Sequence, residues 1–158
     1  MSISTYQILD TLKMRVLGFD WGTKRIGVAV GNTLLNQANP LKTLAARNGV
    51  PDWKDVGQLI KEWHPEALIV GVPLDISGKE LATTARAKAF GVLLEQKFQL
   101  SVHLVDERLT TVEARQQLFE EGGYRKIQSS QVDSYAAKLM IEQWLFEGAY
   151  VKKSVANQ

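Results

Sequence analysis

Acidic residues stand at three places in this sequence where metal-dependent chemistry could occur. Asp20 follows an apolar, β-branched stretch and precedes a glycine turn. Asp106 and Glu107 end a second such stretch, and Asp133 lies in the first turn of an amphipathic segment. Clustered carboxylates raise one another's pKa unless a cation lies among them, and oxygen-only ligands favour Mg²⁺ or Mn²⁺ over zinc. Because two such ions can bind both the attacking water and the leaving oxygen, the pattern indicates phosphodiester hydrolysis.

Each acid also has a purely structural interpretation. Asp20 could stabilise its own turn by hydrogen bonding to nearby backbone. Asp133 follows Ser130 by three residues, the spacing of a capping box at a helix start. Glu107 could form an exposed ion pair with Arg108, which would contribute little energy. The local residues leave both interpretations open.

Basic residues near these acids are candidates for contacts with nucleic-acid phosphates. The six candidates are Arg25, Lys79, Arg86, Arg108, Arg125 and Lys126. Lys79 and Arg86 are seven residues apart, which predicts one helix face, and this face could equally be solvated. The net charge of +2 permits a polyanionic partner without requiring one.

The elements that must position the acids can be read from hydrophobic periodicity and turn residues. Residues 14–31 predict a β-hairpin whose turn follows Asp20. Further strands are predicted at 41–46, 67–73 and 100–105. Helices are predicted at 51–64, 77–98, 110–121 and 130–148. The second of these helices should start at a capping box, Ser77 to Glu80, and bury a stripe formed by Leu81, Ala85, Ala89 and Val92.

This order of elements predicts an α/β fold with three layers. Its centre would be a mixed five-stranded sheet with the first three strands antiparallel and helices on both faces. We expect a single domain over 14–148, an N-terminal arm over 1–13 and a flexible C-terminal tail over 149–158. Function in such sheets gathers at the strand ends, where the acids lie.

Composition narrows the class of protein. The chain has no cysteine, so a disulfide framework and a thiolate site are excluded. No apolar run approaches the roughly 20 residues that a membrane span needs, and residues 1–13 lack the features of a secretory signal. We therefore expect a soluble protein without a membrane partner.

Four ordered motifs in this sequence resemble those of the YqgF family, the Holliday junction resolvase-like proteins also described as pre-16S rRNA nucleases. The resemblance extends from about Met14 to Gly148. The motifs are Asp20-x-Gly22 with Arg25-Ile26-Gly27-x-Ala29, Gly71-Val72-Pro73-Leu74, Asp106-Glu107-Arg108-Leu109-Thr110, and Val132-Asp133-x-x-Ala136-Ala137.

The resemblance implies an RNase H-like fold, a cytoplasmic location and a metal-dependent nuclease that processes the 5′ end of pre-16S rRNA in ribosome biogenesis. It implies that Asp20, Glu107 and Asp133 are both the catalytic residues and the ligands of Mg²⁺ or Mn²⁺. The implied partner is structured RNA or branched DNA, and we expect a monomer or a weak homodimer.

Two alternatives to RNA processing remain at this stage. One is a resolvase acting on Holliday junctions or other branched DNA. The other is a non-catalytic nucleic-acid-binding module, because Asp75 and Ser77 stand where the family usually has Asn and Asp. The family also tends to carry Lys or Arg directly before Val132, where this chain has Gln131.

Overall fold

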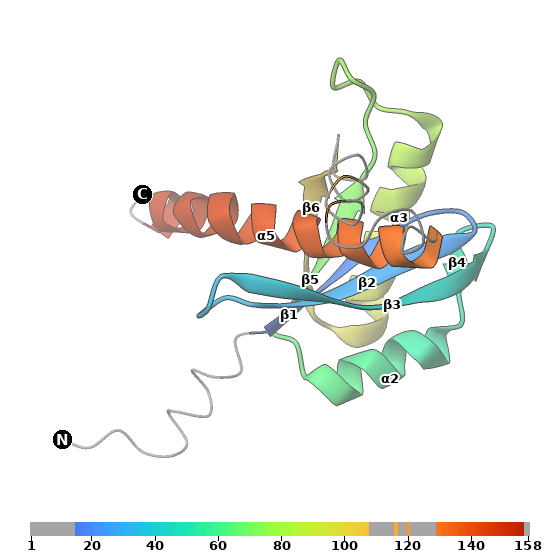
Figure 1. The fold of residues 1–158 in the computed structure, drawn as a ribbon, viewed down its shortest axis with the longest axis horizontal. Helices are drawn as coiled ribbons and strands as arrows, with labels where there is room; N and C mark the ends of the chain where they lie inside the picture. Colours follow the sequence, from blue (N-terminus) through green and yellow to red (C-terminus); the bar gives the residue numbers. More distant parts are fainter. Residues whose placement is uncertain (1–14, 108–115, 117–119, 121–128, 157–158) are drawn as a thin grey trace.

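The computed structural model describes residues 15–107, 116, 120 and 129–156 (Figure 1). The predicted arm at 1–13 and most of the predicted helix at 110–121 lie outside the described residues. Within the described part of the chain, no helix is both long and apolar enough to cross a membrane.

A mixed sheet forms the centre of the fold, in the order β4-β3-β2-β1-β5-β6. Its strands are β1 (Arg15–Asp20), β2 (Arg25–Asn32), β3 (Gln37–Arg47), β4 (Val50–Pro51), β5 (Ala67–Val72) and β6 (Ser101–Asp106). The first three strands are antiparallel, as predicted, and β5 lies parallel to both β1 and β6.

The sheet has six strands where the sequence predicted five. The additional strand, β4, pairs with the end of β3 through the two-residue turn Asn48-Gly49. Both turn residues have positive φ, 53° and 82°, which suits the type I′ turn that joins tight hairpins. The predicted third strand was also too short, because β3 begins at Gln37 rather than Leu41.

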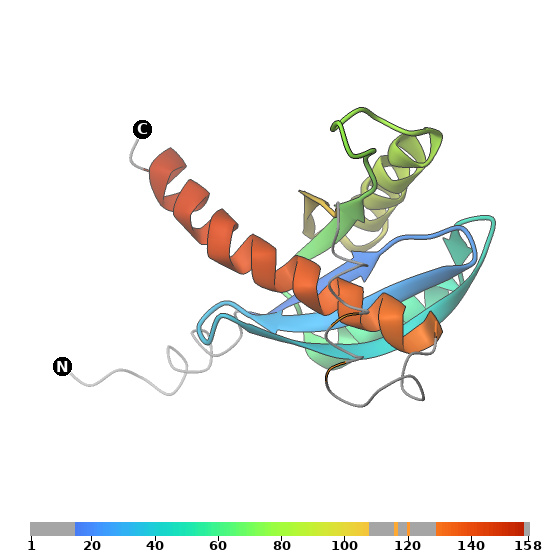
Figure 2. The ribbon, with the colours of Figure 1, turned by 45° about the horizontal axis from the view of Figure 1, so that its top comes forward.

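Helices cover both faces of the sheet (Figures 1 and 2). Helices α2 (Trp53–Trp63) and α3 (Ala82–Phe98) pack on one face against Leu17, Phe19 and their neighbours. Helix α5 (Ser129–Ala156) crosses the other face and buries Ala137, Met140 and Ile141 there. This arrangement confirms the predicted three-layer α/β architecture.

Small residues on the α5 face of the sheet allow the helix to lie close to it. Side chains alternate between the faces of a strand, so Gly18 and Gly31 point toward α5 while Leu17 points away. A Cβ atom added at Gly18 would lie 2.5 Å from Ile141 Cγ1, and one added at Gly31 would also be too close to Ile141. The glycines therefore set the separation between helix and sheet.

Four predictions about the helices were wrong in detail. Helix α3 starts at Ala82, after a Leu81 N-cap whose amide donates to Thr84 Oγ1, so Ser77 and Glu80 form no capping box. Its buried face is formed by Thr84, Ala87, Phe90, Gly91 and Leu94 rather than the predicted stripe. Lys79 precedes the helix and shares no face with Arg86. Helix α5 continues to Ala156, past the predicted end at Gly148.

Candidate functional site

Asp20 lies between two glycines at one level of the sheet. It pairs with Gly27 on β2 and with Gly71 on β5. Residues directly opposite one another on paired strands point to the same face, so all three positions face α5. Because neither neighbour has a side chain, the space on each side of the Asp20 carboxylate is open to groups from elsewhere in the chain.

The backbone of Asp133 fills the space above Gly27. A Cβ added at Gly27 would approach the carbonyl of Asp133 far closer than 3.0 Å, and it would lie 2.7 Å from Ser134 N. The second turn of α5 therefore rests directly on β2. The prediction that Asp133 lies in the first turn, capped by Ser130, was wrong, because α5 already includes Ser129 and its first turn holds no acid. The Asp133 carboxylate accepts a hydrogen bond from Arg25 Nε at 2.8 Å, across a sequence separation of 108 residues.

Glu107 fills the corresponding space above Gly71. A Cβ added there would collide with Glu107 Oε2 and would lie 2.6 Å from Met140 Sδ. Asp106 pairs with Val72, one residue beyond Gly71, so strand alternation turns Asp106 toward the α3 face. The geometry thus selects Glu107 rather than Asp106 as the acid beside Asp20.

The acids strongly affect each other's proton affinity. Burial raises the pKa of Asp20 well above its usual value, and the hydrogen bond to Glu107 and the charges of Glu107 and Asp133 raise it further. Burial also raises the pKa of Glu107, against the lowering effect of the hydrogen bond with Asp20. Asp20 and Glu107 therefore hold protons more tightly than exposed carboxyl groups do, and Arg25 pairs with Asp133.

These three carboxylates have the donor chemistry of a site for Mg²⁺ or Mn²⁺. Neighbouring carboxylates repel one another, which raises their pKa values, and a bound divalent cation would offset this repulsion. Among the described residues, no three acidic, His or Cys side chains are already arranged to hold one ion. In this structure the Asp133 carboxylate is engaged by Arg25 at 2.8 Å.

The predicted phosphate contacts have different places in the structure. Arg25 is about half exposed and pairs with Asp133. Lys79 is exposed in the loop between β5 and α3. Arg86 donates to Asn48 O and Oδ1, both at 2.8 Å, and its guanidinium lies 5.3 Å from the ring centre of Trp21. Three further candidates, Arg108, Arg125 and Lys126, lie outside the described residues.

Trp21 is an important residue that the sequence analysis did not identify. It is buried directly after Asp20, and its Nε1 donates to Gly49 O at 2.9 Å. The Gly49 amide in turn donates to Thr23 O at 2.8 Å. The Asn48-Gly49 turn therefore holds the end of β1 in place, and that dipeptide was the signal that could have revealed it.

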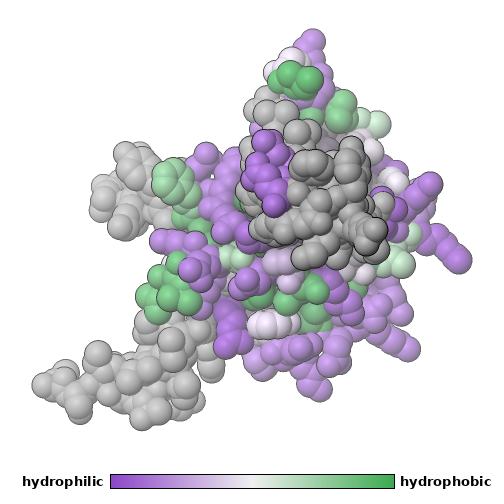
Figure 3. Space-filling view, in the orientation of Figure 1, coloured by the Kyte–Doolittle hydropathy of each residue, from purple (hydrophilic) through white to green (hydrophobic). Residues whose placement is uncertain are grey.

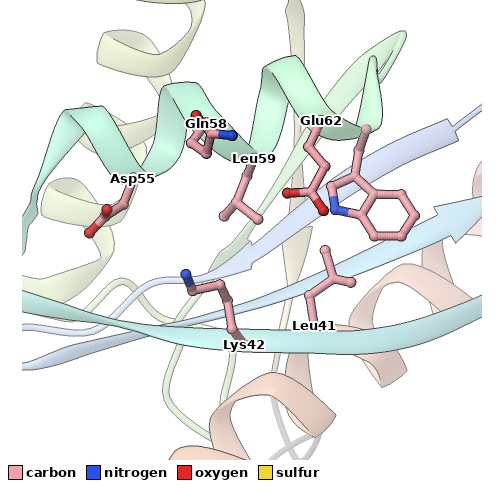
Figure 4. A pocket seen from close by; sticks show the side chains of 7 residues that line it. Leu41, Lys42, Asp55, Gln58, Leu59 and Glu62 are labelled. Carbon is pink, nitrogen blue, oxygen red and sulfur yellow. The ribbon is translucent and has the colours of Figure 1, made fainter.

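A separate hollow of about 200 Å³ lies between α2 and β3, on the face away from the acids. Figure 4 shows Leu59 and Glu62 on α2 pointing toward Leu41 and Lys42 on β3, and Asp55 and Gln58 of α2 also line the hollow. The charged residues that line this hollow include both acids and a lysine, and none of them is Asp20, Glu107 or Asp133. Glu62 is therefore a useful control acid for experiments on the site.

Comparison with known families identifies the chain. The family described as "RuvX: Holliday junction resolvase" matches residues 14–147. The chain belongs to the RuvX family. This confirms the YqgF resemblance, and the family's matched region contains the whole candidate site.

Curated members of the RuvX family are similar over most of their length. A Legionella pneumophila protein named "Putative pre-16S rRNA nuclease" is 56% identical over 129 residues, covering 82% of this chain and 93% of the relative. Proteins with the same name from Aeromonas hydrophila and Photobacterium profundum are 47% and 48% identical, covering 84% and 85% of this chain and 94% and 95% of theirs.

Solved structures support the fold assignment. Thermus thermophilus RuvC, in a complex with a Holliday junction substrate, matches with a TM-score of 0.52 and 18% identity, covering 86% of this chain and 96% of RuvC. Fowlpox virus resolvase matches with a TM-score of 0.50 and 14% identity, covering 84% of this chain and 99% of the resolvase. At such identities the likeness shows the fold, and it confirms the predicted RNase H-like class.

Proposed function

We propose that this protein is a metal-dependent nuclease that hydrolyses phosphodiester bonds in structured RNA, namely at the 5′ end of pre-16S rRNA in the cytoplasm. The proposal rests on the position of Asp20 between its cross-strand partners Gly27 and Gly71. The Asp133 backbone packs on Gly27, and the Glu107 carboxylate packs on Gly71. The names of relatives at 45–56% identity favour the RNA substrate.

Each residue of the site has a role in this proposal. Asp20, Glu107 and Asp133 would hold Mg²⁺ or Mn²⁺, which supplies an activated water and neutralises the charge that develops on the phosphate. Arg25 lies beside Asp133 and could turn to a phosphate oxygen when the acid is engaged. The buried Trp21 keeps Asp20 at a fixed position, which limits the entropy lost on binding.

The test is cleavage of an RNA that contains the 5′ leader of 16S rRNA, with Mn²⁺ or Mg²⁺ present. Asp20→Asn should abolish cleavage without lowering the melting temperature of the metal-free protein, whereas Glu62→Gln should cleave normally. Mn²⁺ at about 100 times its Kd should stabilise the unmodified protein by ~2.7 kcal/mol and the Asp20 variant far less. Cleavage that survives Asp20→Asn would refute the assignment.

A second candidate function is resolution of branched DNA, supported by the family description and by the fold of a RuvC bound to a Holliday junction. A four-way DNA junction offered in the same assay distinguishes the two substrates. Salt-sensitive RNA binding without any metal-dependent cutting would instead indicate a non-catalytic module.

A further inference from the structure

The loop between β5 and α3, residues 73–81, presents an apolar side chain at its tip. Ile76 is 92% exposed, the highest value among the exposed large hydrophobic side chains of the described residues. In Figures 1 and 2 this loop projects beyond the body of the molecule, and Figure 3 shows hydrophobic colour close to that end. Single exposed hydrophobic residues are common, so the construction of the loop decides whether this one matters.

The loop is held in shape by Asp75. Its Oδ1 accepts hydrogen bonds from Ser77 Oγ at 2.6 Å and from the Lys79 amide at 2.9 Å. The Asp75 amide donates to Lys79 O, and the Gly78 amide donates to Asp75 O, both at 3.0 Å. Gly78 has a φ of 89°, which closes the turn at little cost only for glycine. The two residues that depart from the family pattern, Asp75 and Ser77, thus bond to each other.

The base of the loop is anchored as well. Thr84 Oγ1 donates to Pro73 O and accepts from the Leu81 amide at 2.7 Å. Glu80 forms a bridge with Leu74 in the backbone and an ion pair with Lys88. A loop that is held at both its tip and its base loses less conformational entropy on binding than a flexible loop does.

The loop also leaves the sheet beside the acid site. Pro73 follows Gly71 by two residues, and Gly71 is the β5 partner of Asp20. The Glu80 carboxylate is engaged by Lys88, and the Asp75 carboxylate accepts hydrogen bonds from within the loop. Lys79 is exposed and follows Ile76 by three residues in the same loop. An apolar tip flanked by a cation suits a polyanion with stacked bases.

We propose that this loop is a preformed wedge that inserts Ile76 between bases at the junction of a duplex and a single strand, next to the phosphate bound at the acid site. The inference rests on the proposed nuclease function. Apolar side chains such as Ile separate base steps in other nucleic-acid-binding proteins, and Lys79 would contact the adjacent phosphate.

The test is unstacking of a reporter base in an RNA duplex with a 5′ single-stranded flank that carries 2-aminopurine at the junction. It uses full-length protein with Asp20→Asn, so that binding is read without cleavage. The Ile76 protein should increase 2-aminopurine fluorescence, and Ile76→Ala should remove most of that increase and weaken binding about tenfold. Ile76→Phe should retain the increase. Leu35→Ala is the matched control, since Leu35 is also exposed, at 62%, in the turn between β2 and β3.

A second pair of variants tests the preformed shape. Asp75→Ala should lose the fluorescence increase although Ile76 is present, and Asp75→Asn, which keeps one acceptor oxygen, should restore part of it. Equal fluorescence for Ile76→Ala and the Leu35→Ala control would overturn the wedge proposal. Normal cleavage by the unmodified protein would still support the proposed nuclease function in that case. If Ile76→Ala instead disrupts self-association or a protein complex and leaves RNA unstacking intact, the wedge is also wrong. Absence of both RNA binding and cleavage would overturn both proposals.

Discussion

Substituting Gly27 by Ala should separate α5 from the sheet and move Asp133 out of the site. The added Cβ would meet backbone atoms of Asp133, which cannot rotate away as a side chain can, so the helix must retreat by about 1 Å to reach an allowed distance. Overpacking of this kind costs about 1–3 kcal/mol. The lower backbone entropy of Ala in the unfolded chain returns less than 1 kcal/mol of that.

The expected result of Gly27→Ala is a net loss of roughly 2 kcal/mol, equivalent to a fall of about 4–8 °C in melting temperature. Displacement of a ligand by ~1 Å should lower the cleavage rate about 100-fold. Stability is measured by thermal melting with and without Mn²⁺, and the Mn²⁺-induced shift should shrink because one ligand has moved.

Gly57→Ala provides the control for this prediction. Gly57 lies inside α2, where an added Cβ would meet only Phe98 Cε1 at an ordinary 3.7 Å. Helix propensity therefore predicts stabilisation of about 1 kcal/mol and unchanged cleavage. If Gly27→Ala melted like the unmodified protein and kept its full Mn²⁺ shift, the close contact between α5 and β2 would not control the site.

Four further predictions concern charge. Folding raises the pKa of Asp20 and Glu107, so the folded state holds protons more tightly than the unfolded state does. The stability of the metal-free protein should therefore fall as the pH rises above about 4. Melting measured as a function of pH checks this, and Asp20→Asn should flatten the decline. Arg25→Gln should change the free energy of unfolding by less than about 1 kcal/mol. The substitution should tighten Mn²⁺ binding, measured by calorimetry, and slow cleavage. Weaker Mn²⁺ binding would show that Arg25 positions Asp133 rather than competing with the metal for it. Arg86→Ala should lower stability by about 1–2 kcal/mol through its lost hydrogen bonds and ring contact, whereas Lys79→Ala should leave the melt unchanged and reduce only the salt dependence of RNA binding.

Local sequence patterns were sufficient for the elements that carry the acids. The apolar, β-branched residues before Asp20 and the glycine turn after it predicted the first hairpin, and hydrophobic periodicity also predicted the helix at 51–64, which is α2. Such patterns succeed because side-chain periodicity depends only on the local backbone. They failed for the buried face of α3, because that face is set by what packs against it rather than by the hydrophobicity of its own residues.

The sequence by itself determined which chemical groups the candidate site can draw on: acidic residues at three places, two of them at strand ends, and no cysteine. Only the tertiary structure decided which atoms meet. Strand register places Asp20 between Gly27 and Gly71, strand alternation selects Glu107 over Asp106, and the approach of α5 joins Asp133 to Arg25. These contacts depend on residue pairs far apart in the chain, and register and helix position are fixed by packing of the whole core, which no local pattern encodes.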